Sequence, residues 1–291
     1  MKLNSSQSGS RTAGFGGRLL FVLWAIPGAW AQAGALSGVV VAANDGQPLA
    51  GAWVTVQDNG RRAVTAADGT FALPGLSGQG LTVVAAARGF YHRALNLDAP
   101  AGGVVFNLEP VAGEDPGYQL WTPQNCGACH PRQLQEWTAT PMARAGVNTW
   151  VHDLYSGTGT AGGLGGFVYT RDSVHAVVNP ASECASCHQP EGWLAQPFSA
   201  LDDNLTSPPP AVVHGVSCEI CHKIGDVDVA KIDFPGLFPG AMHFTRPAGE
   251  QVEYGVLGDV AYEAGGVMRA SLQPQLSDAV CGLCHQDKSA I

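Results

Sequence analysis

The stretch Gly215-Val216-Ser217-Cys218-Glu219-Ile220-Cys221-His222-Lys223 contains the pattern that decides how most of this chain folds: two cysteines three residues apart, followed by a histidine. The pattern occurs four times and accounts for all eight cysteines. The other copies are Cys126-Gly127-Ala128-Cys129-His130, Cys184-Ala185-Ser186-Cys187-His188 and Cys281-Gly282-Leu283-Cys284-His285. Residues i, i+3 and i+4 share one face of a helix, so each copy is expected to present two thiols and one imidazole together.

Cys-x-x-Cys-His is the attachment signal for c-type haem, in which the thiols add to the porphyrin and the imidazole ligates the iron. Paired cysteines also form disulfides, bind zinc or act as redox dithiols, but none of these uses needs the following histidine. With 9 histidines in 291 residues, chance alone would place one after all four pairs roughly once in a million sequences. We therefore predict four covalently attached haem c groups, with His130, His188, His222 and His285 as proximal iron ligands.

Four further histidines in this half of the chain match the number of haems, which predicts bis-histidine ligation throughout and a lower potential than His/Met ligation gives. They are His152, His175, His214 and His243. His214 is the favoured ligand because it lies four residues before Cys218, where it is expected to reach a neighbouring haem rather than its own. Met142 is the rival ligand, and Met242 adjoins His243, although a methionine more often fills a gap in a core.

The first 31 residues are expected to be a signal peptide. Residues 1–18 carry three basic side chains and no acidic one, residues 19–30 are apolar, and Ala29-Trp30-Ala31 offers a small-x-small cleavage site. The apolar run is shorter than the roughly 20 residues that a membrane span needs. We expect an exported protein, periplasmic or extracellular, without a transmembrane span.

Charge divides the remaining chain into two expected domains. Residues 32–111 carry four basic and five acidic side chains, whereas residues 112–291 carry eight basic and nineteen acidic ones, a net charge of −11. The join at 112–117 has the Gly, Pro and Asp content of a linker. Charged residues make up only 13% of the chain, which excludes a coiled coil, and the acidity argues against nucleic acid as a partner.

Residues 32–111 are expected to form a small all-β sandwich. Short apolar stretches at 36–42, 52–56, 62–65, 70–73, 81–86 and 104–108 alternate with turn signals such as Asp58-Asn59-Gly60 and Asp68-Gly69. Pro48-Leu49-Ala50-Gly51-Ala52-Trp53-Val54, Ala67-Asp68-Gly69-Thr70-Phe71 and Arg88-Gly89-Phe90-Tyr91 resemble the carboxypeptidase regulatory-like (transthyretin-like) family. That resemblance implies a non-catalytic appendage for stability, adhesion or docking. His92 is expected to be an ordinary strand or loop residue, the alternative being that it caps a haem.

Residues 126–285 resemble the multihaem c-type cytochromes related to the electron carriers of hydroxylamine oxidation. The resemblance lies in the first motif with Glu136-Trp137-Thr138-x-Thr140-x-Met142-Ala143, in 183–194 and in 215–223. Many members have Trp-x-x-Ser-x-His at the first site, with that histidine as a distal ligand. Met142 occupies the matching position here, which implies His/Met ligation or another histidine. The chain stops six residues after His285, where relatives are expected to continue, so an incomplete C-terminus is expected.

The predicted fold is therefore a small sandwich followed by a mainly α and irregular multihaem cytochrome c domain with little regular structure. We expect short helices at the motifs, a helix over 132–138 and sparse β-structure. The leading functional hypothesis is an electron carrier, not an enzyme, that serves other redox proteins through closely packed haems. The alternatives are a multihaem oxidoreductase acting on a small nitrogen compound and a homo-oligomeric subunit of an extracellular cytochrome filament.

Overall fold

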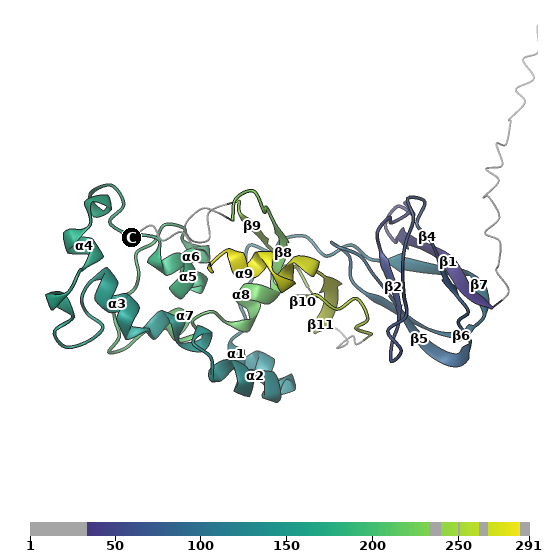
Figure 1. Ribbon diagram of the computed structural model, residues 1–291, viewed down its shortest axis with the longest axis horizontal. Helices are drawn as coiled ribbons and strands as arrows, with labels where there is room; N and C mark the ends of the chain where they lie inside the picture. The colour runs from purple at the N-terminus through teal and green to yellow at the C-terminus, as the bar shows by residue number, and fades with distance from the viewer. Residues whose placement is uncertain (1–33, 233–239, 250, 262–266, 286–291) are drawn as a thin grey trace, which may run out of the picture. The chain divides into compact units, whose positions relative to one another are not determined.

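The computed structural model describes residues 34–232, 240–249, 251–261 and 267–285 (Figure 1). The expected signal peptide, residues 1–31, lies outside the described residues. Within the described ranges, no helix is both long enough and apolar enough to cross a bilayer.

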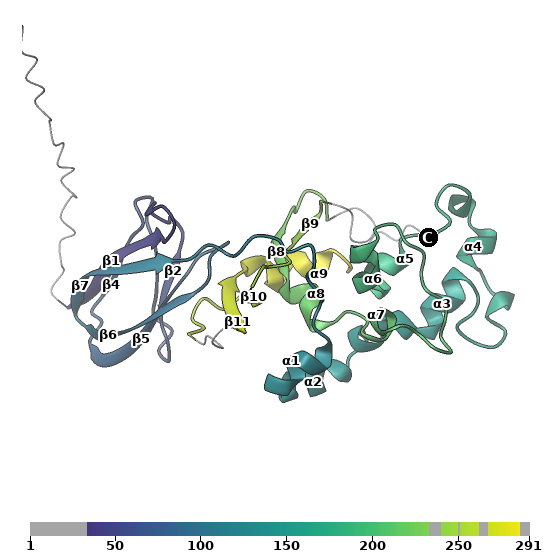
Figure 2. The same cartoon turned by 180° about the vertical axis from the view of Figure 1, so that it is seen from behind.

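The N-terminal part is a β-sandwich of two sheets. One sheet has the order β4-β1-β7 and the other has the order β3-β2-β5-β6. The strands are β1 (Ala35–Ala42), β2 (Trp53–Val56), β3 (Arg62–Val64), β4 (Thr70–Pro74), β5 (Gly78–Ala86), β6 (Arg93–Ala99) and β7 (Ala101–Leu108). All of them except β3 are labelled in Figures 1 and 2. All pairs are antiparallel except β1 with β7, which is parallel. The predicted all-β domain is confirmed, and β6 is a strand that the sequence analysis did not identify.

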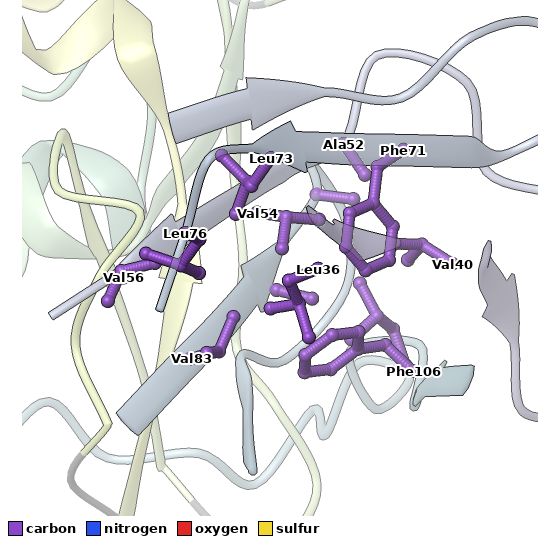
Figure 3. Packing of buried hydrophobic residues seen from close by; sticks show 13 residues of the cluster. Leu36, Val40, Ala52, Val54, Val56, Phe71, Leu73, Leu76, Val83 and Phe106 are labelled. Atoms are coloured by element: carbon purple, nitrogen blue, oxygen red, sulfur yellow. The ribbon is translucent and has the colours of Figure 1, made fainter. Parts of the chain in front are cut away.

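Alternating apolar residues form the core of the sandwich. In β4, Phe71 and Leu73 are buried while their neighbours are exposed, as the two-residue period of a strand requires. The Phe71 ring lies 5.9 Å from the Phe106 ring of β7, and Figure 3 shows both beside Leu36 and Val40 of β1. Thr65 closes one edge of the core, because its hydroxyl accepts from the Ala52 amide at 2.8 Å and donates to the Leu49 carbonyl at 2.5 Å.

The rest of the chain is a mixed helical and irregular region. Its helices have at most eight residues within the described ranges. They are α1 (Pro123–Cys129), α2 (Pro131–Thr138), α3 (Thr149–Tyr155), α4 (Tyr169–Asp172), α5 (Cys184–His188), α6 (Pro190–Ala195), α7 (Pro210–Val213), α8 (Cys218–His222) and α9 (Ala279–Gly282), with 3-10 turns η1 (Met142–Val147), η2 (Gly163–Gly165), η3 (Val174–Val177) and η4 (Pro274–Ser277). The helix predicted over 132–138 is confirmed as α2, and the expectation of short helices at the motifs is also confirmed.

Two small sheets complete this region. β8 (Ile224–Val227) pairs antiparallel with β9 (Met242–Phe244), and β10 (Gln251–Gly255) pairs parallel with β11 (Met268–Leu272). A second apolar core gathers residues from the helices and from β8 and β9, and three motif cysteines pack against it. These cysteines are Cys184, Cys221 and Cys284. The second, third and fourth motifs therefore lie against this core.

Candidate functional site

All four Cys-x-x-Cys-His motifs lie on a helical turn. The first runs from α1 into His130, whose amide donates to the Cys126 carbonyl at 2.9 Å. The second and third form α5 and α8. In the fourth, the His285 amide donates to the Cys281 carbonyl at 2.8 Å and extends the turn of α9. The expected i, i+3, i+4 arrangement of two thiols and one imidazole is thus the local geometry at each motif.

Proline and capping residues start these short helices. Thr122 caps α1 in a reciprocal arrangement with Asn125, and Pro123 occupies the first helical turn. Pro131 and Pro190 begin α2 and α6 directly after the first and second motifs. Since proline cannot continue a preceding helix, each of these motifs is confined to little more than one turn.

The motifs meet through their cysteines, all of which are free thiols. Interaction between Cys126 and Cys218 raises the pKa of Cys126 and lowers that of Cys218 to about 7. A similar interaction raises the pKa of Cys284 and lowers that of Cys187.

A third proximity links the two pairs. Burial raises the pKa of Cys221 to about 11, and the nearby thiol of Cys281 raises it further by electrostatic repulsion. The thiols of Cys126 and Cys218 are therefore close enough to interact, as are those of Cys187 and Cys284, and Cys221 and Cys281 influence each other electrostatically.

The imidazole of the third motif is held from behind. His222 Nδ1 lies 2.7 Å from the Tyr254 carbonyl oxygen in β10. A carbonyl oxygen only accepts hydrogen bonds, so Nδ1 carries the proton and Nε2 keeps its lone pair. Histidines that bind metals are oriented in this way by a carbonyl or carboxylate behind the ring.

The other motif histidines differ in their surroundings. Burial lowers the pKa of His188, and its Nδ1 is buried without a hydrogen-bond partner. Burial therefore favours the neutral imidazole, which is the form that ligates iron. His130 and His285 are exposed.

Of the four further histidines, His214 has the surroundings of a ligand. Its Nδ1 lies 2.8 Å from Glu191 Oε2, and both side chains are largely buried. A carboxylate behind a histidine fixes the ring and raises its basicity at the other nitrogen. The structure therefore gives His214 an orienting partner that sequence analysis did not identify.

His152 has different surroundings from His214. It is fully buried, with Nδ1 3.1 Å from Asp203 Oδ1 and Nε2 2.9 Å from the Gly146 carbonyl. Both ring nitrogens are engaged, so in this arrangement neither faces a ligand position. His175 and His243 are exposed. The ligand assignments of all three remain predictions.

Met142 lies against the segment that leads into the third motif. The Val216 amide donates to the Met142 carbonyl at 3.0 Å, and Trp137 Nε1 donates to the Val216 carbonyl at 2.8 Å. Gly215 has φ +55°, and a Cβ there would come within 2.4 Å of the Met142 carbonyl oxygen. Met142 itself is 43% exposed. The structure thus places the backbone of Met142 beside the segment that contains His214, so the two leading candidates for distal ligand lie near each other in the fold.

His243 and Met242 line a hollow of about 510 Å³ together with Asp226, Asp228 and Gly240. This volume is within the range of cofactor pockets, about 300–1,000 Å³. The two carboxylates in the lining are already paired, Asp226 with Arg88 and Asp228 with Lys231 at 3.1 Å. The hollow therefore presents an imidazole and a thioether, and each of its two carboxylates has a basic partner.

A buried network of charged and polar groups surrounds the third motif. Glu219 and Lys223 are fully buried and lie 3.1 Å apart. Glu219 accepts from the Tyr118 hydroxyl at 2.7 Å and from the Trp121 amide at 2.6 Å. Lys223 donates to the Val252 carbonyl at 2.6 Å and to Glu253 at 2.5 Å.

The roles of Glu219 and Lys223 were not predicted from the sequence. The signal was present, because Glu and Lys four residues apart on a helix form a favourable pair. Burial raises the pKa of Glu253, while the ammonium of Lys223 opposes that rise. Burial is the main cause that raises the pKa of Tyr118, and its hydrogen bond to Glu219 raises this pKa further. Separating the buried charged groups of this network would therefore cost free energy.

Among the described residues, no three or more His, Cys, Asp or Glu side chains come together as a metal-binding group. A haem iron requires only axial ligands from the protein. The motifs with their orienting groups are consequently the candidate functional site of this chain.

Residues 35–109 match the carboxypeptidase regulatory-like domain, which confirms the resemblance predicted for the sandwich. No curated protein matches the chain. Two similar solved structures are a C-terminal and an N-terminal interface mutant of the type II cohesin–X-dockerin complex from Acetivibrio cellulolyticus. Their identities are 19% and 21%, each TM-score is 0.23, and they cover 31% and 28% of this chain. The chain spans 65% and 58% of those two chains, less than two thirds of their length.

Proposed function

We propose that this protein is an exported tetrahaem c-type cytochrome that transfers electrons between redox partners. The observation that carries the proposal is the set of four Cys-x-x-Cys-His motifs, each on a helical turn and each with a thiol beside that of another motif. A short helix of this kind is sufficient for haem attachment, since two thiols and one imidazole need only one turn.

The residues present fit the group. Cys126 and Cys129, Cys184 and Cys187, Cys218 and Cys221, and Cys281 and Cys284 would tether four haems. His222 is already oriented by the Tyr254 carbonyl, and the Nδ1 of His188 is buried without a hydrogen-bond partner. When bound, each haem supplies one-electron iron chemistry.

His214 is the favoured distal ligand, because Glu191 orients its ring and leaves Nε2 available. His243, in its hollow beside Met242, is the second candidate. His175 is exposed on η3 between Val174 and Val177, which are 80% and 86% exposed and would pack against a porphyrin. His152 would first have to give up two hydrogen bonds.

Electrons would pass through the motifs in the order first, third, fourth, second. This order follows from the thiol proximities and differs from the order along the chain. The third and fourth motifs would be the inner positions. The acidic surface of residues 112–291, with a net charge of −11, would steer encounters with basic patches on redox partners.

Haem content tests the proposal directly. The exported full chain is expected to carry four haems that stay attached in denaturant, measured by intact mass and by alkaline pyridine absorbance. Replacing Cys126 and Cys129 with alanine should reduce the count to three, whereas Ala128→Ser, between the same cysteines, should leave four. Absence of covalent haem, or four haems in the double cysteine variant, would overturn the proposal.

Spectroscopy separates a carrier from an enzyme. An electron carrier with every iron six-coordinate should give only low-spin signals in electron paramagnetic resonance. A high-spin fraction that binds small ligands would instead favour a multihaem oxidoreductase. A Met–iron charge-transfer band that disappears in Met142→Ala would identify Met142 as a ligand, and size-exclusion chromatography would reveal a filament.

A further inference from the structure

The segment that follows β5 forms an isolated β-bridge with the two-stranded sheet of β10 and β11, beside the third motif. Tyr91 forms an antiparallel bridge with Ser271 of β11, and the His92 amide donates to the Ala270 carbonyl at 2.9 Å. The Ser271 hydroxyl also donates to the Phe90 carbonyl at 2.9 Å. β11 is paired with β10 through Tyr254 and Ser271. Tyr91, which lies between β5 and β6 of the sandwich, is therefore separated from Tyr254 by one strand, β11.

Apolar packing reinforces this pairing. Tyr91, Val252 and Tyr254 form a separate buried cluster, with exposed fractions of 5%, 0% and 4%. The guanidinium of Arg269 lies over the Tyr91 ring at 4.1 Å and bonds to Glu109 at 2.5 Å. The cluster keeps water away from the backbone of β10, where an unpaired carbonyl would otherwise be hydrated.

Tyr254 is fixed at both ends. Its hydroxyl donates to Thr245 at 3.2 Å, and its carbonyl accepts from His222 Nδ1 at 2.7 Å. Displacement of the Tyr254 ring would move the carbonyl as well, because the two belong to one residue of a paired strand. The position of the His222 imidazole therefore depends on contacts made by Tyr91.

We infer that the β-sandwich positions the third haem ligand, with Tyr91 as a positioning residue that acts through Tyr254 on His222. This inference rests on the proposed function and assigns a role to the sandwich within it. A hydrogen bond from Nδ1 raises the basicity of a metal-bound imidazole and so stabilises the oxidised iron. Loosening the Tyr254 carbonyl should raise the potential of this haem alone.

The first test is a redox titration of the full-length holoprotein with Tyr91→Ala. One of the four haems should shift to higher potential, and the other three should keep theirs. Loss of an orienting partner changes metal affinity by about 10- to 100-fold, and each tenfold change in a one-electron equilibrium is about 59 mV. Tyr91→Phe keeps the packed ring and should leave all four potentials unchanged.

Hydrogen exchange provides a readout that does not depend on electron transfer. Amides of 251–255 should exchange faster in Tyr91→Ala and also in Ser271→Ala, which removes one bond to the Phe90 carbonyl and little volume. Phe71→Ala is the matched control, because it weakens the sandwich core without touching β10 or β11. It should leave both this exchange and the potentials as they are.

The outcomes distinguish the inference from the function on which it rests. Unchanged exchange in Tyr91→Ala and Ser271→Ala would overturn the inference. Faster exchange with four unmoved potentials would also overturn it, while the cytochrome proposal would stand. A chain without covalent haem would overturn both, and haem content identifies that case before any titration.

Discussion

Replacing Glu219 with alanine should destabilise the C-terminal region more than any substitution of an exposed acidic residue. Glu219 and Lys223 are fully buried at 3.1 Å, and Glu219 also accepts from the Tyr118 hydroxyl and the Trp121 amide. Glu219→Ala would leave Glu253 as the one carboxylate beside the buried ammonium and would remove the acceptor of the Trp121 amide, while the Tyr118 hydroxyl would keep its bond to Gln251. Breaking one side of a buried ion pair costs about 3–5 kcal/mol.

The chain contains a matched control for this substitution. Arg132 and Glu136 are also four residues apart on a helix, but their side chains are 83% and 61% exposed. Exposed pairs at this spacing contribute at most about 0.5 kcal/mol, so Glu136→Ala should have little effect on the free energy of unfolding. Glu219→Gln, which keeps the shape but removes the charge, should fall between the two alanine variants.

Thermal unfolding of the full chain measures the difference. A change of 1 kcal/mol moves the Tm of a region of this size by about 2–4 °C, so Glu219→Ala should lower it by about 6–20 °C. A double variant that also removes Lys223 should be less destabilised than the sum of the single variants, because the two residues interact directly. Equal shifts for Glu219→Ala and Glu136→Ala would refute the reasoning, since burial would then contribute nothing.

Three further substitutions test other parts of the molecule. Gly215→Ala places a Cβ 2.4 Å from the Met142 carbonyl oxygen at a φ of +55°, so it should cost at least about 1–3 kcal/mol in denaturant unfolding; a neutral effect would contradict the close approach. Thr65→Val removes the acceptor of the buried Ala52 amide and should cost about 1–3 kcal/mol, and a smaller loss would mean that water replaces the hydroxyl. Burial lowers the pKa of His92 below its ordinary value of 6.5, so the folded state binds fewer protons than the unfolded state. The free energy of unfolding should therefore fall as pH decreases through 6.5; His92→Gln should reduce that slope, and an unchanged slope would place the dependence elsewhere.

Local patterns in the sequence predicted much of the secondary structure. Alternation identified β4, where Phe71 and Leu73 are buried, and the run after Pro131 identified α2. Strand β6 was missed although its apolar and polar residues alternate, because Asn96 and Asp98 are residue types that are depleted in strands. Its burial is only partial, which leaves the apolar signal weak.

The arrangement of the motifs was not predictable from local patterns. Cys126 meets Cys218, and Tyr91 meets Ser271, across long stretches of chain that carry no pairing signal. The orienting partner of His214, Glu191, lies in the helix after the second motif and gave no hint in the sequence. Spacing predicted which residues could hold haem, but only the fold brings their orienting groups to them.

The third motif combines two kinds of contact on one short helix. Isolated helices below about 12–15 residues are marginal, so the five residues of α8 need contacts from outside. Glu219 and Lys223 provide these through Trp121 and the Val252 carbonyl. They are offset by one position from Cys218 and His222 and therefore lie on a different face of the helix. Polar anchors on that face hold α8 in place while its thiols and imidazole stay available to a porphyrin, which explains why a charged pair is buried beside a proposed redox centre.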